Sequence, residues 1–116
     1  MILNSLTYDE IFEAAIKIMI SIEHRITISY MKNSISIRFP TTRKLAEYLQ
    51  MPHYYVLPHF AMMERDGLIS RVERVGISTT KKGSKKLIKL IGTKFKEDIK
   101  SILNENLLNE LQKYIS

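Results

Sequence analysis

The sequence predicts a mainly α-helical domain with a small β-hairpin, an α+β fold with additional helices at both ends of the chain. Three observations support this prediction. Over most of the chain, apolar residues recur at steps of three or four, which is the period of an amphipathic helix. The alternating runs 68–74 and 77–79 flank Val75-Gly76, as the strands of a hairpin flank its turn. A length of 116 residues is typical of one domain, so we expect residues 1–116 to form a single domain.

The first helix is predicted over about 8–22. Thr7 and Glu10 have the spacing of a capping box, in which each side chain binds a free amide at the helix start. The apolar positions that follow keep the helical period: Ile11, Ala15, Ile18, Ile22, Ile26 and Tyr30. We therefore favour a helix that continues, after a break near His24, to Lys32-Asn33. The alternative is a hairpin that pairs 25–31 with 35–39, because Ile26-Thr27-Ile28 alternates like a strand.

Two helices separated by a short turn are predicted in the middle of the chain, after a short alternating strand over 34–39. Thr41 or Thr42 is a suitable N-cap for the first of them, and Met51-Pro52 ends it. The second helix ends at Asp66-Gly67, since glycine can adopt the left-handed cap. The apolar positions expected to face the core are Leu45, Ala46, Leu49, Val56, Phe60 and Met63.

The C-terminal third is also predicted to be helical. Thr80 caps a helix that runs through Ile91 and is closed by Gly92. Residues 93–116 continue as helix, weakest at 104–106. They present an apolar stripe formed by Phe95, Ile99, Ile102, Leu103, Leu107, Leu111 and Tyr114. The terminal helices, about 8–32 and 93–115, add apolar surface beyond the needs of a core over about 35–92. We expect them to support that core or to form a homodimer.

The positive charge is concentrated in one part of the sequence. The chain has 18 Lys and Arg against 12 Asp and Glu, a net charge of +6. Residues 68–100 contain ten basic and three acidic side chains, a net of +7, so the rest of the chain is close to neutral. A basic segment of this kind favours a polyanionic partner.

Several classes of function are disfavoured by what the sequence lacks. The absence of cysteine excludes disulfides, thiolate zinc sites, iron–sulfur clusters and a cysteine nucleophile. His53 and His59 are six positions apart on a predicted helix and point in different directions, so no metal site is expected. No glycine-flanked serine or phosphate-binding loop indicates an enzyme, and no cofactor is predicted. No apolar run reaches the length of a membrane span and no signal peptide is evident, so we expect a cytoplasmic, nucleoid-associated protein.

Four segments, taken in order, carry a resemblance to a known family: 39–49, Met51-Pro52, 63–69 and 80–83. Their order resembles the winged helix-turn-helix DNA-binding domain of MarR-, PadR- and ArsR-type transcriptional regulators. The resemblance covers about 35–92. It implies sequence-specific binding of double-stranded DNA, with a recognition helix over 53–66 in the major groove and a basic wing over 68–80 on the backbone. It also implies a homodimer through the terminal helices.

The expected DNA contacts fall into three groups. Inward-facing Val56, Phe60 and Met63 leave the base-facing positions to His53, Tyr54, Tyr55 and His59. The start of the preceding helix suits phosphate oxygens and offers Thr41, Thr42, Arg43 and Lys44. The wing and the helix after it add Arg71, Arg74, Lys81 and Lys82.

Two features depart from the family pattern. The first half of the recognition helix has no Lys or Arg, so base reading would rest on Tyr, His and apolar contacts with thymine methyls. Pro58 lies within that helix. A helix that begins near Tyr54 loses little, whereas one that begins at Pro52 should kink. The alternative function is a winged-helix module that docks on a protein of the transcription or replication machinery, and RNA or general chromatin binding is a third reading.

Overall fold

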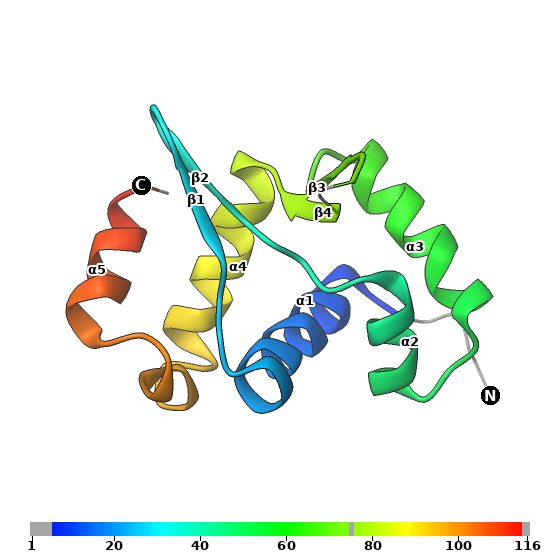
Figure 1. Ribbon diagram of the computed structural model, residues 1–116, viewed down its shortest axis with the longest axis horizontal. Coiled ribbons are helices and arrows are strands. Elements are labelled where there is room, and N and C mark those ends of the chain that lie inside the picture. The colour runs from blue at the N-terminus through cyan, green and yellow to red at the C-terminus, as the bar shows by residue number, and fades with distance from the viewer. Residues whose placement is uncertain (1–5, 75, 115–116) are drawn as a thin grey trace.

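The computed structural model describes residues 6–74 and 76–114 and has an α+β fold (Figure 1). The helices and strands in chain order are α1 (Tyr8–Lys17), the π-helix η1 (Ile18–Glu23), β1 (Ile28–Met31), β2 (Ser34–Ile37), α2 (Thr42–Leu49), α3 (His53–Arg65), β3 (Ile69–Val72), β4 (Gly76–Thr79), α4 (Lys81–Thr93), the 3-10 helix η2 (Asp98–Ser101) and α5 (Glu105–Lys113). The mainly helical class with few strands is therefore confirmed. Within the described residues there are two hairpins, β1–β2 and β3–β4.

The chain after the first helix differs from the favoured prediction. The capping box at Thr7 and Glu10 is present, and the helical segment reaches Glu23 through η1. The continuation to Lys32-Asn33 is wrong, because β1 and β2 pair as an antiparallel hairpin from Ile28↔Ile37 to Met31↔Ser34. His24 takes a left-handed conformation, φ 53°, which ends the helix, and the β-branched residues that follow favour a strand.

A short connection sets α3 against α2, as the sequence predicts. Thr41 is the N-cap of α2 and its hydroxyl accepts the Lys44 amide at 3.2 Å. Residues 50–52 join the helices, and α3 begins at His53 with Pro52 as its N-cap. Pro58 is the sixth residue of α3, beyond the first turn, so the Tyr54 carbonyl has no amide partner four residues on.

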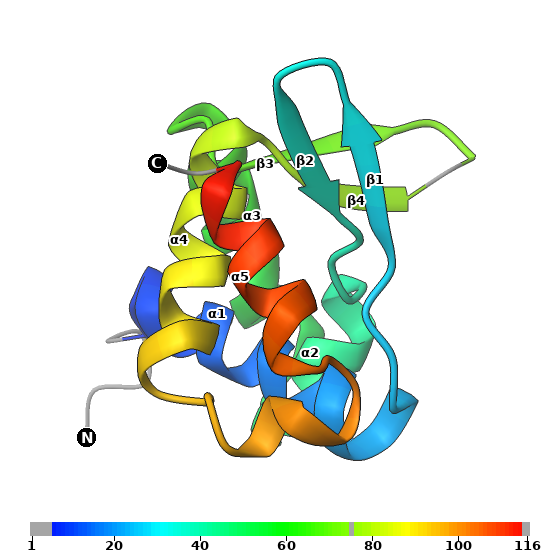
Figure 2. The same cartoon turned by 90° about the vertical axis from the view of Figure 1, so that its left-hand side faces the viewer.

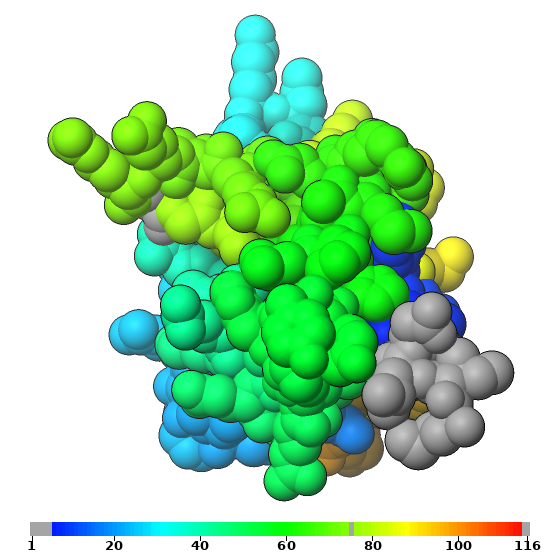
Figure 3. Space-filling view, turned by 90° about the vertical axis from the view of Figure 1, so that its right-hand side faces the viewer, coloured from blue at the N-terminus to red at the C-terminus, as the bar shows by residue number. Residues whose placement is uncertain are grey.

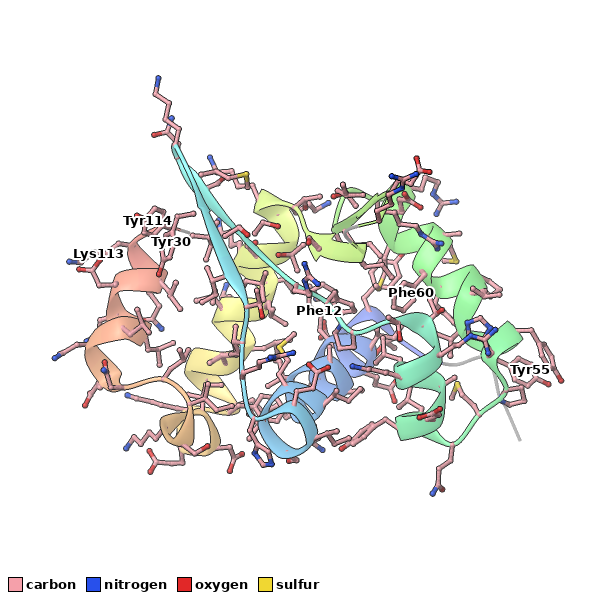
Figure 4. All side chains as sticks on the ribbon, in the orientation of Figure 1. Phe12, Tyr30, Tyr55, Phe60, Lys113 and Tyr114 are labelled. Carbon is pink, nitrogen blue, oxygen red and sulfur yellow. The ribbon has the colours of Figure 1, made fainter. Side chains whose placement is uncertain are left out.

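The hydrophobic core joins the N-terminal helix to α3. The Phe12 and Phe39 ring centroids are 5.2 Å apart, and the Phe39 and Phe60 centroids 5.9 Å. All three side chains are buried, and Figure 4 shows Phe12 and Phe60 on their separate helices. Val56 and Met63 are buried beside Phe60, which confirms the predicted inner face of α3.

Buried hydroxyl groups connect the two hairpins. The Ile37 amide donates to Thr79 Oγ1 at 2.8 Å, and the Thr79 and Ser84 hydroxyls are 2.7 Å apart. Ser84 Oγ donates to the Ile35 carbonyl at 2.7 Å, so its single proton is used and Thr79 must donate to Ser84. We call this chain of bonds the hydroxyl relay. The relay provides hydrogen-bond partners for the β2 backbone on the edge away from β1, and it joins β2 to β4 and α4.

The C-terminal segment covers the other side of α4. α4 runs through Thr93, so Gly92 lies inside the helix rather than closing it as predicted. The helix prediction for residues 93–116 is right only in part. Asn104 caps α5 where the sequence was weakest, and residues 115–116 lie outside the described residues. Figures 1 and 2 show α5 alongside α4, at the end of the molecule opposite α3.

The predicted apolar stripe is mostly buried against this same chain. Its fully buried members are Phe95, Ile99, Leu103 and Leu111, and Leu108 is buried in place of Leu107. The ring centroids of Tyr114 and Tyr30, which lies on β1, are 5.6 Å apart. Figure 4 shows the two labelled side chains next to each other. In the part of the chain that the structure describes, no helix combines the length and apolar character needed to cross a membrane.

Removing the Tyr8 hydroxyl is expected to raise the pKa of Asp66. Tyr8 Oη donates to Asp66 Oδ2 at 2.6 Å, and this bond lowers the Asp66 pKa and raises that of Tyr8. A carboxyl with a lowered pKa stabilises the fold above its ordinary pKa, and the stabilisation is lost as the pH falls through the lowered value. An NMR titration of the Asp66 carboxyl in Tyr8→Phe should therefore show a higher midpoint than in the wild type. Tyr30→Phe is the control, and equal midpoints in all three proteins would contradict the assignment.

Candidate nucleic-acid interface

Helix α3 and the β3–β4 hairpin form one outer face of the molecule. Figure 3 shows α3 across the centre of this face and the hairpin projecting beside it. The helix is held from behind by Val56, Phe60 and Met63, and its C-terminal end turns into β3 through Gly67, whose φ of 77° suits the left-handed cap that the sequence predicts. One side of α3 is therefore fixed to the core and the other is presented to solvent.

The solvent side of α3 is apolar and uncharged over most of its length. Tyr54 is 66% exposed, Met62 40% and Leu57 38%. With the exposed residues Pro58 and Ala61 they form what we call the apolar ridge. Sequence reasoning placed Tyr54 on this side. It missed Leu57, Pro58 and Ala61, although their spacing of three, four and seven from Tyr54 places them on the same face.

The other three predicted base-facing residues are half-buried. His53 Nε2 lies 2.6 Å from Thr42 Oγ1, so these two predicted contact residues bind each other and join the starts of α2 and α3. The Tyr55 ring lies 4.8 Å from that of Tyr54, and Figure 4 shows Tyr55 at the extreme end of α3. His59 is half-buried. Of the four residues, Tyr54 offers the largest free surface.

The start of α2 carries one unpaired cation. Lys44 Nζ is bound to Glu23 Oε2 at 2.6 Å, and Thr41 and Thr42 use their hydroxyls for the N-cap and for His53. Arg43 is exposed and has no ion pair within the described residues. Within the described residues, Arg43 is therefore the member of this group whose charge could bind a phosphate.

The β3–β4 hairpin presents Arg74 near its tip. Arg74 is exposed and has no ion pair among the described residues, whereas Arg71 Nε lies 3.4 Å from Glu64 Oε1. Val72 is 49% exposed, because only Ile69 of β3 reaches the core. The turn residue Val75 lies outside the described residues.

Part of the basic segment stabilises the fold. Lys86 is bound to Asp9, and Lys94 Nζ lies 2.9 Å from Glu13 Oε2, so α4 is joined to α1 by two ion pairs. Lys82 donates to the Asp66 carbonyl at 3.2 Å. The carboxylates of α1 are about eighty residues away in sequence, so the net charge of the basic segment alone does not reveal these ion pairs. The exposed cations of α4 without an ion pair in the described chain are Lys81, Lys82, Lys85 and Lys89.

No group of three or more His, Asp or Glu side chains that could hold a metal ion occurs within residues 6–74 and 76–114. Exposed cations without an ion pair in the described chain include Arg43 at the start of α2, Arg74 on the hairpin and Lys81 at the start of α4. Comparison of the chain with known proteins finds no family model, no curated protein and no solved structure that matches it.

Proposed function

We propose that the protein binds double-stranded DNA as a winged-helix transcriptional regulator, with α3 in the major groove and the β3–β4 hairpin on the backbone. The observation that carries this proposal is the pairing of an outward-facing helix with a projecting, cationic hairpin on one face. The order α2, short connection, α3, hairpin and α4 supports it, since this is the order that the family resemblance implies.

The chemistry of the face suggests which residues would contact the bases and which would contact the phosphates. Tyr54, Leu57 and Met62 are suited to apolar contact with thymine methyls, the readout available to a helix whose first half has no Lys or Arg. Arg43 and Arg74 lie on either side of α3 in the sequence, and neither guanidinium group has an ion pair within residues 6–74 and 76–114. Such groups favour phosphate oxygens, which position a protein on the duplex without reading its sequence.

A salt-titrated fluorescence anisotropy assay with duplex DNA tests this proposal. Each neutralised phosphate contributes about −0.9 to the slope of log affinity against log salt. Arg43→Ala and Arg74→Ala are each expected to make the slope less steep by about that amount, and Tyr54→Ala to change the preferred sequence. Lys96→Ala is the matched control, because it removes one exposed charge from the segment after α4, away from α3 (Figure 1).

Two results would overturn the DNA-binding proposal. One is the absence of duplex binding at low salt. The other is an equal change of slope in Lys96→Ala and in the two arginine variants.

The apolar ridge favours a second candidate function, docking on a protein of the transcription or replication machinery. Protein interfaces are depleted of charge at their centre and enriched in Tyr and Met, as this ridge is. On this alternative, Tyr54→Ala weakens association with the protein partner, while Arg43→Ala and Arg74→Ala have little effect. The same variants therefore separate the two functions.

Homodimerisation through the terminal helices stays a prediction. Helix-turn-helix proteins are commonly two-fold dimers, which is the reason to expect it. The apolar residues that motivated it, such as Phe95, Ile99 and Leu111, are buried within one chain. The apolar side chains still exposed on the predicted terminal helices are Ile22, Tyr30 and Met31.

A further inference from the structure

A recessed cavity lies between the end of η1 and the start of α2. Its volume is about 170 Å³. Met19 and Phe39 contribute apolar lining, and Arg25, Arg38 and Lys44 contribute positive charge. The cavity is separate from the apolar ridge, which shares no residue with it.

The charges that line the cavity do not balance. Three cationic residues face one carboxylate, Glu23, which is already bound to Lys44 at 2.6 Å. Arg25 and Arg38 have no ion pair within the described residues. The cavity therefore carries an excess of two positive charges from side chains that no group of the described protein neutralises.

Backbone hydrogen bonds hold the main chain at both arginines. The Arg25 amide donates to the Met19 carbonyl at 3.0 Å, where the chain leaves η1. The Arg38 amide donates to the Thr27 carbonyl at 2.9 Å, and Arg38 also bridges to Ser78 of β4. Two segments thirteen residues apart in sequence thus bring like charges to one cavity, an arrangement that a bound anion relieves.

We propose that this cavity binds a phosphate group. Guanidinium groups bind phosphate in a bidentate manner, and Thr41, the N-cap of α2, lines the same cavity. The recessed shape and the small volume favour the phosphate of a free small molecule over one held on the rigid backbone of a duplex. The proposal goes beyond DNA binding and does not rest on it.

An occupant of the cavity would contact the helix that supports α3. Thr41 lines the cavity, and the next residue, Thr42, is bound to His53 at the start of α3. A phosphate at this position would therefore be connected, through Thr41 and Thr42, to His53 at the start of the helix proposed to enter the major groove. This gives the free ligand a route to alter duplex affinity.

Titration of the ¹⁵N-labelled protein with inorganic phosphate, at constant ionic strength against chloride, tests the proposal by NMR. Saturable shifts are expected at the amides of Arg25, Arg38 and 41–44. Arg25→Gln and Arg38→Gln should each weaken phosphate binding by about tenfold or more, the effect of losing one charged hydrogen-bonding group. Lys85→Gln, a matched loss of one exposed charge on α4, should leave the affinity unchanged.

The spectra also report whether each variant remains folded, so a lost fold is distinguished from a lost site. Shifts that stay linear with phosphate concentration, or equal affinities in the arginine and Lys85 variants, would overturn the proposal. This titration contains no DNA, so the two proposals can fail separately. Phosphate binding by a protein that does not bind duplex DNA would support the phosphate site and overturn the proposed DNA-binding function.

A second arm identifies the source of the phosphate group. Duplex affinity is measured by anisotropy for the wild type, Arg25→Gln and Arg38→Gln, with and without inorganic phosphate at constant ionic strength. Equal duplex affinities of the three proteins support a free ligand. Weaker duplex binding by both variants, together with competition between phosphate and duplex, assigns the cavity to the DNA backbone instead and overturns the free-ligand source.

Discussion

Replacing Gly83 with alanine is expected to lower the free energy of unfolding by about 2–3 kcal/mol, the upper range for forcing an extra methyl group into a packed site. A Cβ atom at this position would lie 1.8 Å from the Leu68 carbonyl oxygen and 2.9 Å from its carbon. Both are backbone atoms and cannot rotate away. The first turn of α4 would have to move away from the start of β3.

This movement would disturb several bonds that join α4 to the hairpin. The Thr80 amide donates to the Leu68 carbonyl at 3.1 Å, and the Thr80 hydroxyl both donates to the Gly67 carbonyl and caps Gly83. We expect the loss to exceed the gain of up to about 1 kcal/mol that alanine brings to a helix interior.

Gly92→Ala provides the matched control, because Gly92 lies in the same helix. Its Cβ would approach Gln112 Nε2 at 2.5 Å, and that atom is the far end of a flexible side chain. This variant should be neutral or slightly stabilised through helix propensity. Urea denaturation of both variants measures the difference, and equal effects would show that α4 does not approach Leu68 as closely as described.

The second large effect is expected from Thr79→Val, which keeps the shape of the side chain and removes its hydroxyl. The Ile37 amide loses its acceptor and Ser84 Oγ loses its donor, both in the buried hydroxyl relay. An unsatisfied buried polar group costs about 1–3 kcal/mol, so we expect a loss of about 2–3 kcal/mol.

The relay also predicts coupling between its two hydroxyls. In a double-mutant cycle, Thr79→Val and Ser84→Ala should destabilise less together than the sum of the single changes, because each removes the partner of the other. Thr93→Val is the control for a threonine whose hydroxyl binds only carbonyls of its own helix, at an exposed position, and should change stability by no more than about 0.5 kcal/mol. Additive losses in the cycle would argue against a continuous relay.

Much of the fold follows from local patterns in the sequence. The N-caps at Thr7, Thr41 and Thr80, the break at residues 50–52 and the left-handed Gly67 are all governed by neighbours within a few residues, and all are confirmed. The segment 25–31 could not be decided in this way. Its apolar spacing continues the helix, and only pairing with 34–37 and a left-handed His24 make residues 28–31 a strand.

The candidate interface was less accessible to the sequence than the fold. The inner face of α3 is set by a period that can be read locally, so Tyr54 was placed correctly on the outer face. The bond between His53 and Thr42, and the ion pairs of Lys86 and Lys94 with α1, depend on how helices pack against each other. No spacing along the chain carries that information, because packing brings together residues far apart in sequence.

Arg74 occupies a backbone conformation that favours glycine. Its φ of 68° costs a residue with a Cβ atom about 1–2 kcal/mol, and the residue stands at the turn of the projecting hairpin. Glycine or asparagine would relieve this strain. A laboratory selection for heat resistance alone will therefore tend to replace Arg74 and discard a charge on which the proposed function depends. Thermal stability and duplex affinity should move in opposite directions at this single position.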